Sequence, residues 1–261
     1  MPSTGRSDHP APRVSAIERL RALPEVFSLR TAATTLDLEI ETMTIYAFRW
    51  RQKGLVENFG RTGVYFNLLK NPDASATMVA EALYMALGNL PLVEVGGSAL
   101  VDSGLTMQRH IRLEVAVSCD LRPTLPTLPG ISLLRRPIWW GTYLTQKSRI
   151  RATRSTVLPC ASASLAMADA ILSHYVRQAG IQTRPTPDRA WLPTPDEVAT
   201  HSYAREDLSR TTHQHLAGLI LAAPEGTFPG SPSPESCAAA IMRTTFAPLA
   251  QELLPDAEMI F

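Results

Sequence analysis

The sequence predicts a mixed α+β protein in two parts: a small N-terminal module, then a larger α+β domain whose small sheet is covered by helices. Three observations favour this class. Residues 15–68 carry helix-spaced apolar stripes and then a short hairpin pattern, residues 110–118 alternate in polarity, and helical spacing returns from about residue 164. The expected divisions are a flexible tail at 1–13, a module at 14–70 and a domain at 71–261.

Size and composition favour a soluble cytoplasmic protein. The chain has 261 residues, of which 45% are hydrophobic, enough for one large domain or two ordinary ones. No apolar run is long enough to span a bilayer, and the polar first twenty residues have no signal-peptide core, so no membrane contact is expected. Cys119, Cys160 and Cys237 are isolated, which fits a reducing compartment without a disulfide framework.

Each predicted helix of the N-terminal module has a local start or stop signal. Ser15 and Ser28 can cap the first turns of two helices, and Gly54 suits the left-handed residue that ends a third. A turn rich in Gly and Asn, at 58–63, separates two short apolar segments and predicts a hairpin. The helices are expected at 16–23, 29–36 and 40–53, and the strands at 55–56 and 64–68.

The third helix is the informative element of this module. Met43, Ala47 and Trp50 fall on one face and should pack inward. The order helix, turn, helix, hairpin is that of a winged helix-turn-helix, which usually places its last helix in the major groove of DNA. The module is therefore predicted to bind double-stranded DNA.

In this interpretation the third helix reads bases, and neighbouring basic residues hold phosphates. Arg49 can donate to guanine edges, while Thr42 and Thr44 can touch phosphates or thymine methyl groups. The predicted DNA-binding residues are Arg30, Thr42, Thr44, Tyr46, Arg49, Lys53, Arg61 and Thr62. The alternative is a protein–protein module with solvated arginines, since nearby carboxylates would repel phosphate. These are Glu39, Glu41 and Glu57.

The net charge of +1 hides a segregation along the chain. Residues 1–70 carry ten Lys/Arg against seven Asp/Glu, 71–104 none against four, 105–154 nine against two, and 155–261 six against eleven. The mid-chain zone predicts a second basic surface toward DNA or a partner. Its predicted residues are Arg109, Arg112, Arg135, Arg136, Arg149, Arg151 and Arg154. Genomic base composition is an alternative explanation for the preference for arginine over lysine, but not for the clustering.

The C-terminal domain reads as strands followed by helices. The alternation at 110–118 predicts a half-buried strand with a neighbour at 131–134. A helix is expected at 74–87 and a strand at 91–95, and later helices at 165–178, within 196–222 and at 237–254.

The segment Gly96-Gly97-Ser98 invites comparison with a nucleotidyltransferase. Such an enzyme places a glycine turn on a triphosphate and holds metal with paired carboxylates on a nearby strand. Here the strand carries Glu114, but the partner position is Ala116. We prefer a glycine turn that lets a strand meet a helix closely. No catalytic residue, cofactor or metal is therefore expected.

Three segments together resemble the AbiEi-type antitoxins of type IV toxin–antitoxin systems. They are RWRQKGLV, GVYFNLL and ALYMALGNLPLVEVGGSALVDSGLT, and the resemblance is clearest over residues 15–120. It implies a winged-helix domain plus an AbiEi-like C-terminal domain in a bacterial phage-defence system. The first domain would repress its own promoter at repeated half-sites, with a homodimer as one arrangement. The second would counter a nucleotidyltransferase-type toxin.

Two other functions stay open at this stage. One is a nucleotidyltransferase-like enzyme with an appended winged helix, whose activity would disappear on Glu114→Gln. The other is a transcription regulator whose C-terminal domain senses a ligand. A toxin-like neighbouring gene would favour the antitoxin over both.

Overall fold

The computed structural model describes residues 15–88, 90–105, 112–120, 125–150, 158–181, 205–228, 230 and 233–247. Within these residues the chain is mixed α+β with two small sheets, which confirms the predicted class at that level. The chain divides into two compact units, residues 1–86 and 87–261. Residues 71–86, assigned from sequence to the second domain, group with the first unit.

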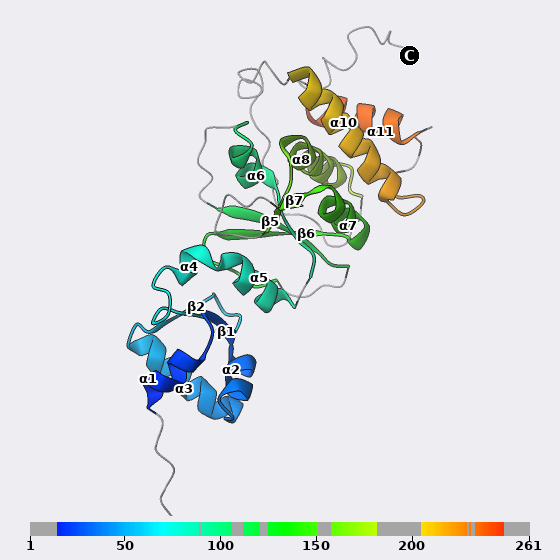
Figure 1. The fold of residues 1–261 in the computed structure, drawn as a ribbon. Coiled ribbons are helices and arrows are strands. Elements are labelled where there is room, and N and C mark those ends of the chain that lie inside the picture. Colours follow the sequence, from blue (N-terminus) through cyan, green and yellow to red (C-terminus); the bar gives the residue numbers. More distant parts are fainter. Residues whose placement is uncertain are drawn as a thin grey trace, which may run out of the picture. The chain divides into compact units, whose positions relative to one another are not determined.

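The first unit combines helices with a three-stranded antiparallel sheet of order β1-β3-β2 (Figure 1). Strands β2 and β3 form the predicted hairpin, in which Glu57 pairs with Phe66, and β1 adds to the other edge of β3. The elements are α1 (Ala16–Ala22), β1 (Val26–Ser28), α2 (Leu29–Thr35), α3 (Ile40–Gln52), β2 (Val56–Asn58), β3 (Val64–Asn67), α4 (Ala74–Thr77) and α5 (Val79–Leu87).

The predicted start and stop signals of these helices are confirmed. The Ser15 hydroxyl accepts the N–H of Glu18 at 3.2 Å, and the Glu18 carboxylate accepts the N–H of Ser15 at 2.8 Å. This reciprocal capping satisfies two amides that the first turn of α1 cannot pair internally. Ser28 accepts the N–H of Thr31 at 3.1 Å, and Gly54 has a φ of 66° just after α3.

One apolar core holds α1, α2, α3 and the three-stranded sheet together. Leu20, Phe27, Met43 and Trp50 are buried in it, from α1, β1 and α3. Asn67, at the end of β3, is also buried, and its side-chain amide donates to the carbonyl oxygen of Leu20 at 3.0 Å. This bond ties β3 to the end of α1, because the same Leu20 carbonyl also accepts the N–H of Leu23 at 3.1 Å.

The single helix predicted at 74–87 is wrong, because the chain breaks at Met78 into α4 and α5. The Thr77 hydroxyl donates to the carbonyl of Asp73 at 3.0 Å and accepts from the Asn71 amide at 3.3 Å. Short polar side chains that bond to the local backbone in this way compete with regular helix.

The second unit is built on a five-stranded mixed sheet of order β6-β5-β4-β8-β7. Strands β5 and β6 are parallel, from Leu113 opposite Ile131 onward, while β4 is antiparallel to β5. The elements are β4 (Leu92–Glu94), α6 (Gly96–Asp102), β5 (Leu113–Ser118), β6 (Ile131–Arg136), α7 (Ile138–Lys147), β7 (Arg149–Ile150), β8 (Pro159–Cys160), α8 (Ala163–Gln178), α10 (Arg205–Ala222) and α11 (Pro234–Thr245).

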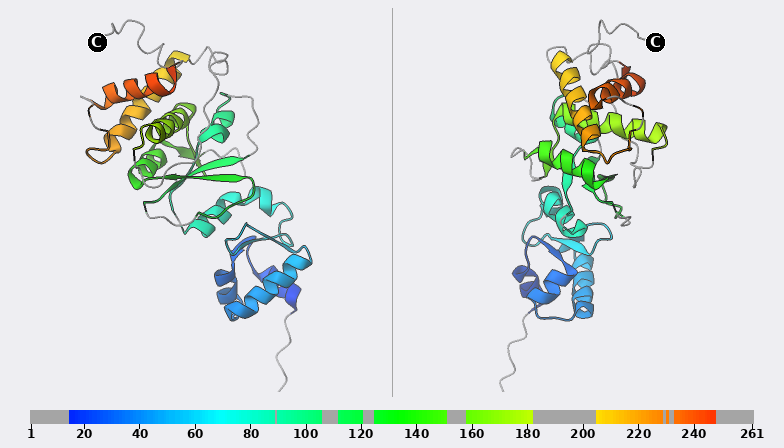
Figure 2. Two further views of the ribbon diagram at one scale, coloured as in Figure 1. Left: turned by 180° about the vertical axis from the view of Figure 1, so that it is seen from behind. Right: turned by 90° about the vertical axis from the view of Figure 1, so that its right-hand side faces the viewer.

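Helices α8, α10 and α11 contact one another and gather at one side of the sheet (Figure 2). The predicted helix at 165–178 is confirmed as α8, and α10 lies within the predicted region 196–222. The last helix, α11, begins at Pro234, before the predicted start at residue 237. Residues 196–204 and 248–254 of those predictions lie outside the described residues. The pair Trp139-Trp140 belongs to α7, where Trp140 is fully buried in the core.

The strand predicted at 110–118 is present as β5, but the prediction that it is half-buried is wrong. Every residue from Glu114 to Ser118 is buried, so β5 is covered on both faces. The reason is its position inside the sheet, between β4 and β6, where both α6 and α7 pack against it. Alternation of residue types therefore did not mark a solvent-facing side here, because the outward positions hold Glu114 and Ala116 against a helix.

Candidate nucleic-acid interface

Helix α3 is held in the first unit by a buried face and one polar anchor. The predicted inward positions Met43, Ala47 and Trp50 are confirmed as buried. The indole N–H of Trp50 donates to the carbonyl oxygen of Ala16 at 3.1 Å, which fixes α3 against the start of α1. The rotation of α3 about its axis is therefore set, and with it the residues that face solvent.

The residues predicted to contact DNA from α3 are placed differently from one another. Thr42, Arg49 and Thr44 are exposed, but the Thr44 hydroxyl donates to the carbonyl of Ile40 at 2.8 Å. Tyr46 is half-buried: its ring lies 5.6 Å from the ring of Trp50 and 5.1 Å from the guanidinium carbon of Arg19. Tyr46 therefore helps to pack α1 against α3, which leaves it little freedom to reach a base.

Two apolar side chains that were not among the predicted contacts lie on the exposed side of α3. Ile45 is 52% exposed and Phe48 is 58% exposed. They are three residues apart, so they are neighbours on one helix face, opposite the buried stripe. Glu41 and Gln52 lie on the same face and are also exposed. A helical projection from the buried stripe would have found this face, but the predicted contacts were drawn only from polar and aromatic residues.

The hairpin turn and the start of α2 are joined, and each carries one exposed basic residue. The N–H of Leu29 donates to the carbonyl oxygen of Gly63 at 3.0 Å, which joins the start of α2 to the hairpin turn. Arg30 follows Leu29, Arg61 lies in that turn, and both are exposed. The Thr62 hydroxyl donates to the Phe59 carbonyl at 2.6 Å and accepts the N–H of Val64 at 3.2 Å, so Thr62 shapes the turn.

The charges of α3 are segregated along its length. Glu39 and Glu41 stand at its first turn, and Arg49, Arg51 and Lys53 stand at its end, all exposed. This arrangement complements the helix dipole and stabilises the helix in any case. It also means that positive charge for phosphate is available from the C-terminal half of α3 and not from its start.

The arginines predicted to form a second basic surface differ in their exposure. Arg112 and Arg149 are exposed and Arg135 is half-buried, whereas Arg109, Arg151 and Arg154 lie outside the described residues. The assignment of Arg136 is wrong. Its side chain is fully buried, and its Nε and Nη2 donate to the two carboxylate oxygens of Asp169 at 2.7 and 2.6 Å.

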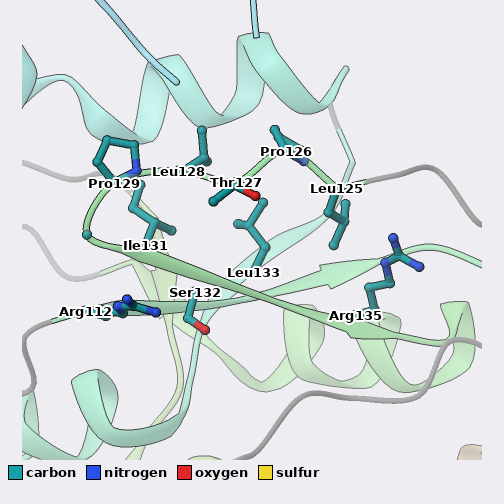
Figure 3. Close-up of a pocket in the computed structure, with 11 residues that line it drawn as sticks. Arg112, Leu125, Pro126, Thr127, Leu128, Pro129, Ile131, Ser132, Leu133 and Arg135 are labelled. Carbon is teal, nitrogen blue, oxygen red and sulfur yellow. The ribbon is translucent and has the colours of Figure 1, made fainter. Parts of the chain in front are cut away.

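A cavity of about 720 Å³ lies beside β6 in the second unit. Figure 3 shows the side chains of Ile131 and Leu133, both in β6, on the side of the strand that faces the loop carrying Leu128. Arg112 and Arg135 lie at opposite ends of the cavity. Its other walls are leucine, proline and threonine side chains of residues 125–129. The combination of an apolar wall with two guanidinium groups would suit a ligand that is apolar in the middle and acidic at an end.

The segment Gly96-Gly97-Ser98 forms a close turn between a strand and a helix, as predicted from the sequence. Gly96 has a φ of 60° between β4 and α6, and the N–H of Gly97 donates to the Glu114 carboxylate at 2.5 Å. The Ser98 hydroxyl donates to the Val95 carbonyl at 3.1 Å and accepts the N–H of Glu114 at 3.2 Å. These bonds join the first turn of α6 to β5.

A group of side chains that could act as metal ligands lies near this turn. Glu94, Asp102 and Cys160 each offer an atom within 4.8 Å of the others, a geometry that could hold a metal ion. Sequence spacing gave no signal of this group, because its members come from β4, α6 and β8 and meet only in the folded sheet.

Compared with known proteins, the sequence matches no protein-family profile and no curated protein. In the part of the chain that the structure describes, no helix has the length and apolar character needed to cross a membrane.

Proposed function

We propose that this chain is a DNA-binding autorepressor and the antitoxin of an AbiE-like type IV system, counteracting a nucleotidyltransferase-type toxin without catalysis of its own. The DNA-binding part of this proposal rests on which faces of α3 are buried and which are exposed. One face is locked in the core through Met43, Ala47 and Trp50, and the opposite face is left to solvent. The antitoxin part rests on the resemblance of residues 15–120 to AbiEi-type antitoxins.

We assign residues 15–68 to a winged helix-turn-helix. Helix α2 and helix α3 are separated by the short turn at 36–39, and the hairpin of β2 and β3 follows at once. In this arrangement α3 enters the major groove and the hairpin turn lies along the backbone. Arg49 donates to a base edge, while Arg30, Lys53 and Arg61 hold phosphates.

Binding to the DNA upstream of the chain's own gene tests this assignment. The full chain should shift that duplex at lower concentration than an unrelated duplex of equal length. Arg49→Ala combined with Arg61→Ala should weaken binding at least tenfold, since one good bidentate base contact alone contributes about 1–3 kcal/mol. A matched control is Arg177→Ala combined with Arg210→Ala, which removes equal charge from α8 and α10. Unchanged affinity of the Arg49/Arg61 variant would refute the groove assignment.

Repression and toxin neutralisation should separate in the same variant. In cells that carry the natural promoter on a reporter and the neighbouring gene under separate control, Arg49→Ala plus Arg61→Ala should lose repression. It should still rescue growth, because the resemblance assigns neutralisation to the second domain. Growth inhibition that this chain does not relieve would reject the antitoxin assignment while leaving DNA binding intact.

A ligand-sensing regulator is the second candidate, and the cavity beside β6 favours it. Arg112 and Arg135 at its ends would recognise an amphipathic carboxylate. Such a ligand should raise the thermal midpoint of the chain and change its affinity for operator DNA, and Arg112→Ala should reduce both effects. The enzymatic alternative has less support, because the carboxylate of Glu114 receives the N–H of Gly97 and its partner position is Ala116.

A further inference from the structure

The outward face of α3 is unusual in having an apolar centre. Ile45 and Phe48 are about half exposed, whereas exposed positions of a surface helix are mostly polar. Folding gains nothing from leaving these side chains in water, so the face points to contact with a partner. It is also small. Charged or amide side chains border it at both ends, namely Glu41, Arg49 and Gln52.

The surroundings of the pair favour a DNA base edge over a protein surface. The core of a protein–protein interface is mostly apolar and is depleted of Lys, Glu and Asp. Here the apolar area is two side chains wide, and exposed Arg49, Arg51 and Lys53 follow it on the same helix. These cations complement phosphate, and the one apolar group on a major-groove base edge is the 5-methyl group of thymine.

We infer that Ile45 and Phe48 are specificity-determining residues that read thymine methyl groups. This inference rests on the proposed major-groove role of α3 and adds the bases that it recognises. Residues three apart on a helix are separated by about 4.5 Å along its axis. Successive base pairs are separated by about 3.4 Å. The two methyl groups therefore lie one or two base steps apart in each half-site, with the base contact of Arg49 beside them.

Selection from a random duplex library with the full chain tests this inference even though the operator sequence is unknown. The enriched half-sites should contain two thymines, on either strand, within two base steps. Replacing each by deoxyuridine removes only the methyl group and should weaken binding about fourfold per site, the value expected for one buried methyl group. Deoxyuridine at thymines outside the half-site should have no effect.

Protein variants then connect each methyl group to its reader. Ile45→Ala and Phe48→Ala should each bind more weakly and lose sensitivity to one deoxyuridine substitution. Both positions are exposed and alanine favours helix, so folding should be kept. Ile17→Ala, at an exposed position of α1, is the matched control and should change nothing.

The outcomes separate this inference from the proposed function. An enriched site that tolerates deoxyuridine at every thymine would overturn methyl reading and leave DNA binding standing. Protection of Ile45 and Phe48 by a protein partner in the absence of DNA would also overturn methyl reading while leaving DNA binding standing. Failure of the wild-type chain to enrich any sequence would overturn both.

Discussion

Removing the carboxylate of Asp169 should destabilise the second unit more than most single changes in the described chain. Asp169 and Arg136 have side chains that are 1% and 0% exposed, and they share two hydrogen bonds of 2.6 and 2.7 Å. The third polar contact of Arg136 goes to the backbone carbonyl of Arg135 at 2.9 Å, and its guanidinium carbon lies 5.0 Å from the Trp140 ring. The arginine is therefore fixed in place on all sides.

The size of the effect follows from the burial of the charge that stays behind. After Asp169→Ala, Arg136 keeps its charge in a site closed to solvent and loses the acceptors of Nε and Nη2. Breaking one side of a buried ion pair costs about 3–5 kcal/mol in free energy of unfolding. Replacing both residues by apolar groups of similar volume is often neutral. Arg136→Met combined with Asp169→Leu should therefore recover most of the loss.

Urea unfolding monitored by tryptophan fluorescence measures both variants. Trp139 and Trp140 lie in α7, next to the ion pair, and report on the second unit, while Trp50 reports on the first. The two units need separate transitions in the fit, because a two-state treatment holds only within one cooperative unit. A loss below about 1 kcal/mol for Asp169→Ala would refute the argument, since an uncompensated buried guanidinium cannot be that well tolerated.

Two further predictions concern the glycine turn and a partly buried histidine. Gly96→Ala should lower the free energy of unfolding by at least about 1 kcal/mol more than Gly104→Ala. Both glycines have positive φ, 60° and 73°, but only at Gly96 would a Cβ collide with the Glu114 carboxylate, so a similar loss in urea titrations of both variants would refute this steric reason. Burial first, and then the charge of Lys147, lower the pKa of His215. Between the unfolded pKa of about 6.5 and the lower folded pKa, the unfolded chain binds more protons than the folded chain. The free energy of unfolding therefore decreases as the pH is lowered through this range. His215→Gln should flatten the difference between unfolding midpoints at about pH 7.5 and pH 5.5, and an undiminished difference would exclude His215 as its source.

The sequence predicted those parts of the fold that depend on neighbours along the chain. Ser15, Ser28 and Gly54 begin or end helices through contacts within a few residues, and the inward stripe of α3 follows from helical spacing alone. By contrast, the amide of Asn67 meets the carbonyl of Leu20, which is 47 residues away in sequence. No local pattern encodes such a partner, and the parallel pairing of β5 with β6 was likewise out of reach.

Strand geometry limits how many of the predicted arginines can share one exposed surface. Arg135 and Arg136 are adjacent in β6, and adjacent residues of a strand point to opposite faces. Two consecutive arginines in a strand covered by helices cannot both belong to one exposed basic surface. The net charge of residues 105–154 does not depend on which face each arginine occupies. The buried partner of Arg136 is Asp169 on α8, which is distant in sequence and is brought to it only by the fold.

The two kinds of exposed side chain on α3 carry different weight as evidence for DNA binding. Glu41 at the start and Arg49 at the end stabilise the helix through its dipole, so their presence has an explanation without any partner. Ile45 and Phe48 do not take part in this dipole effect, and they lie next to each other on the outward face of α3. Phosphate contacts from three cations give a slope of log affinity against log salt of only about −3. If α3 binds DNA, its affinity therefore has to come largely from base contacts, and discrimination between sequences should persist at salt concentrations that abolish non-specific binding.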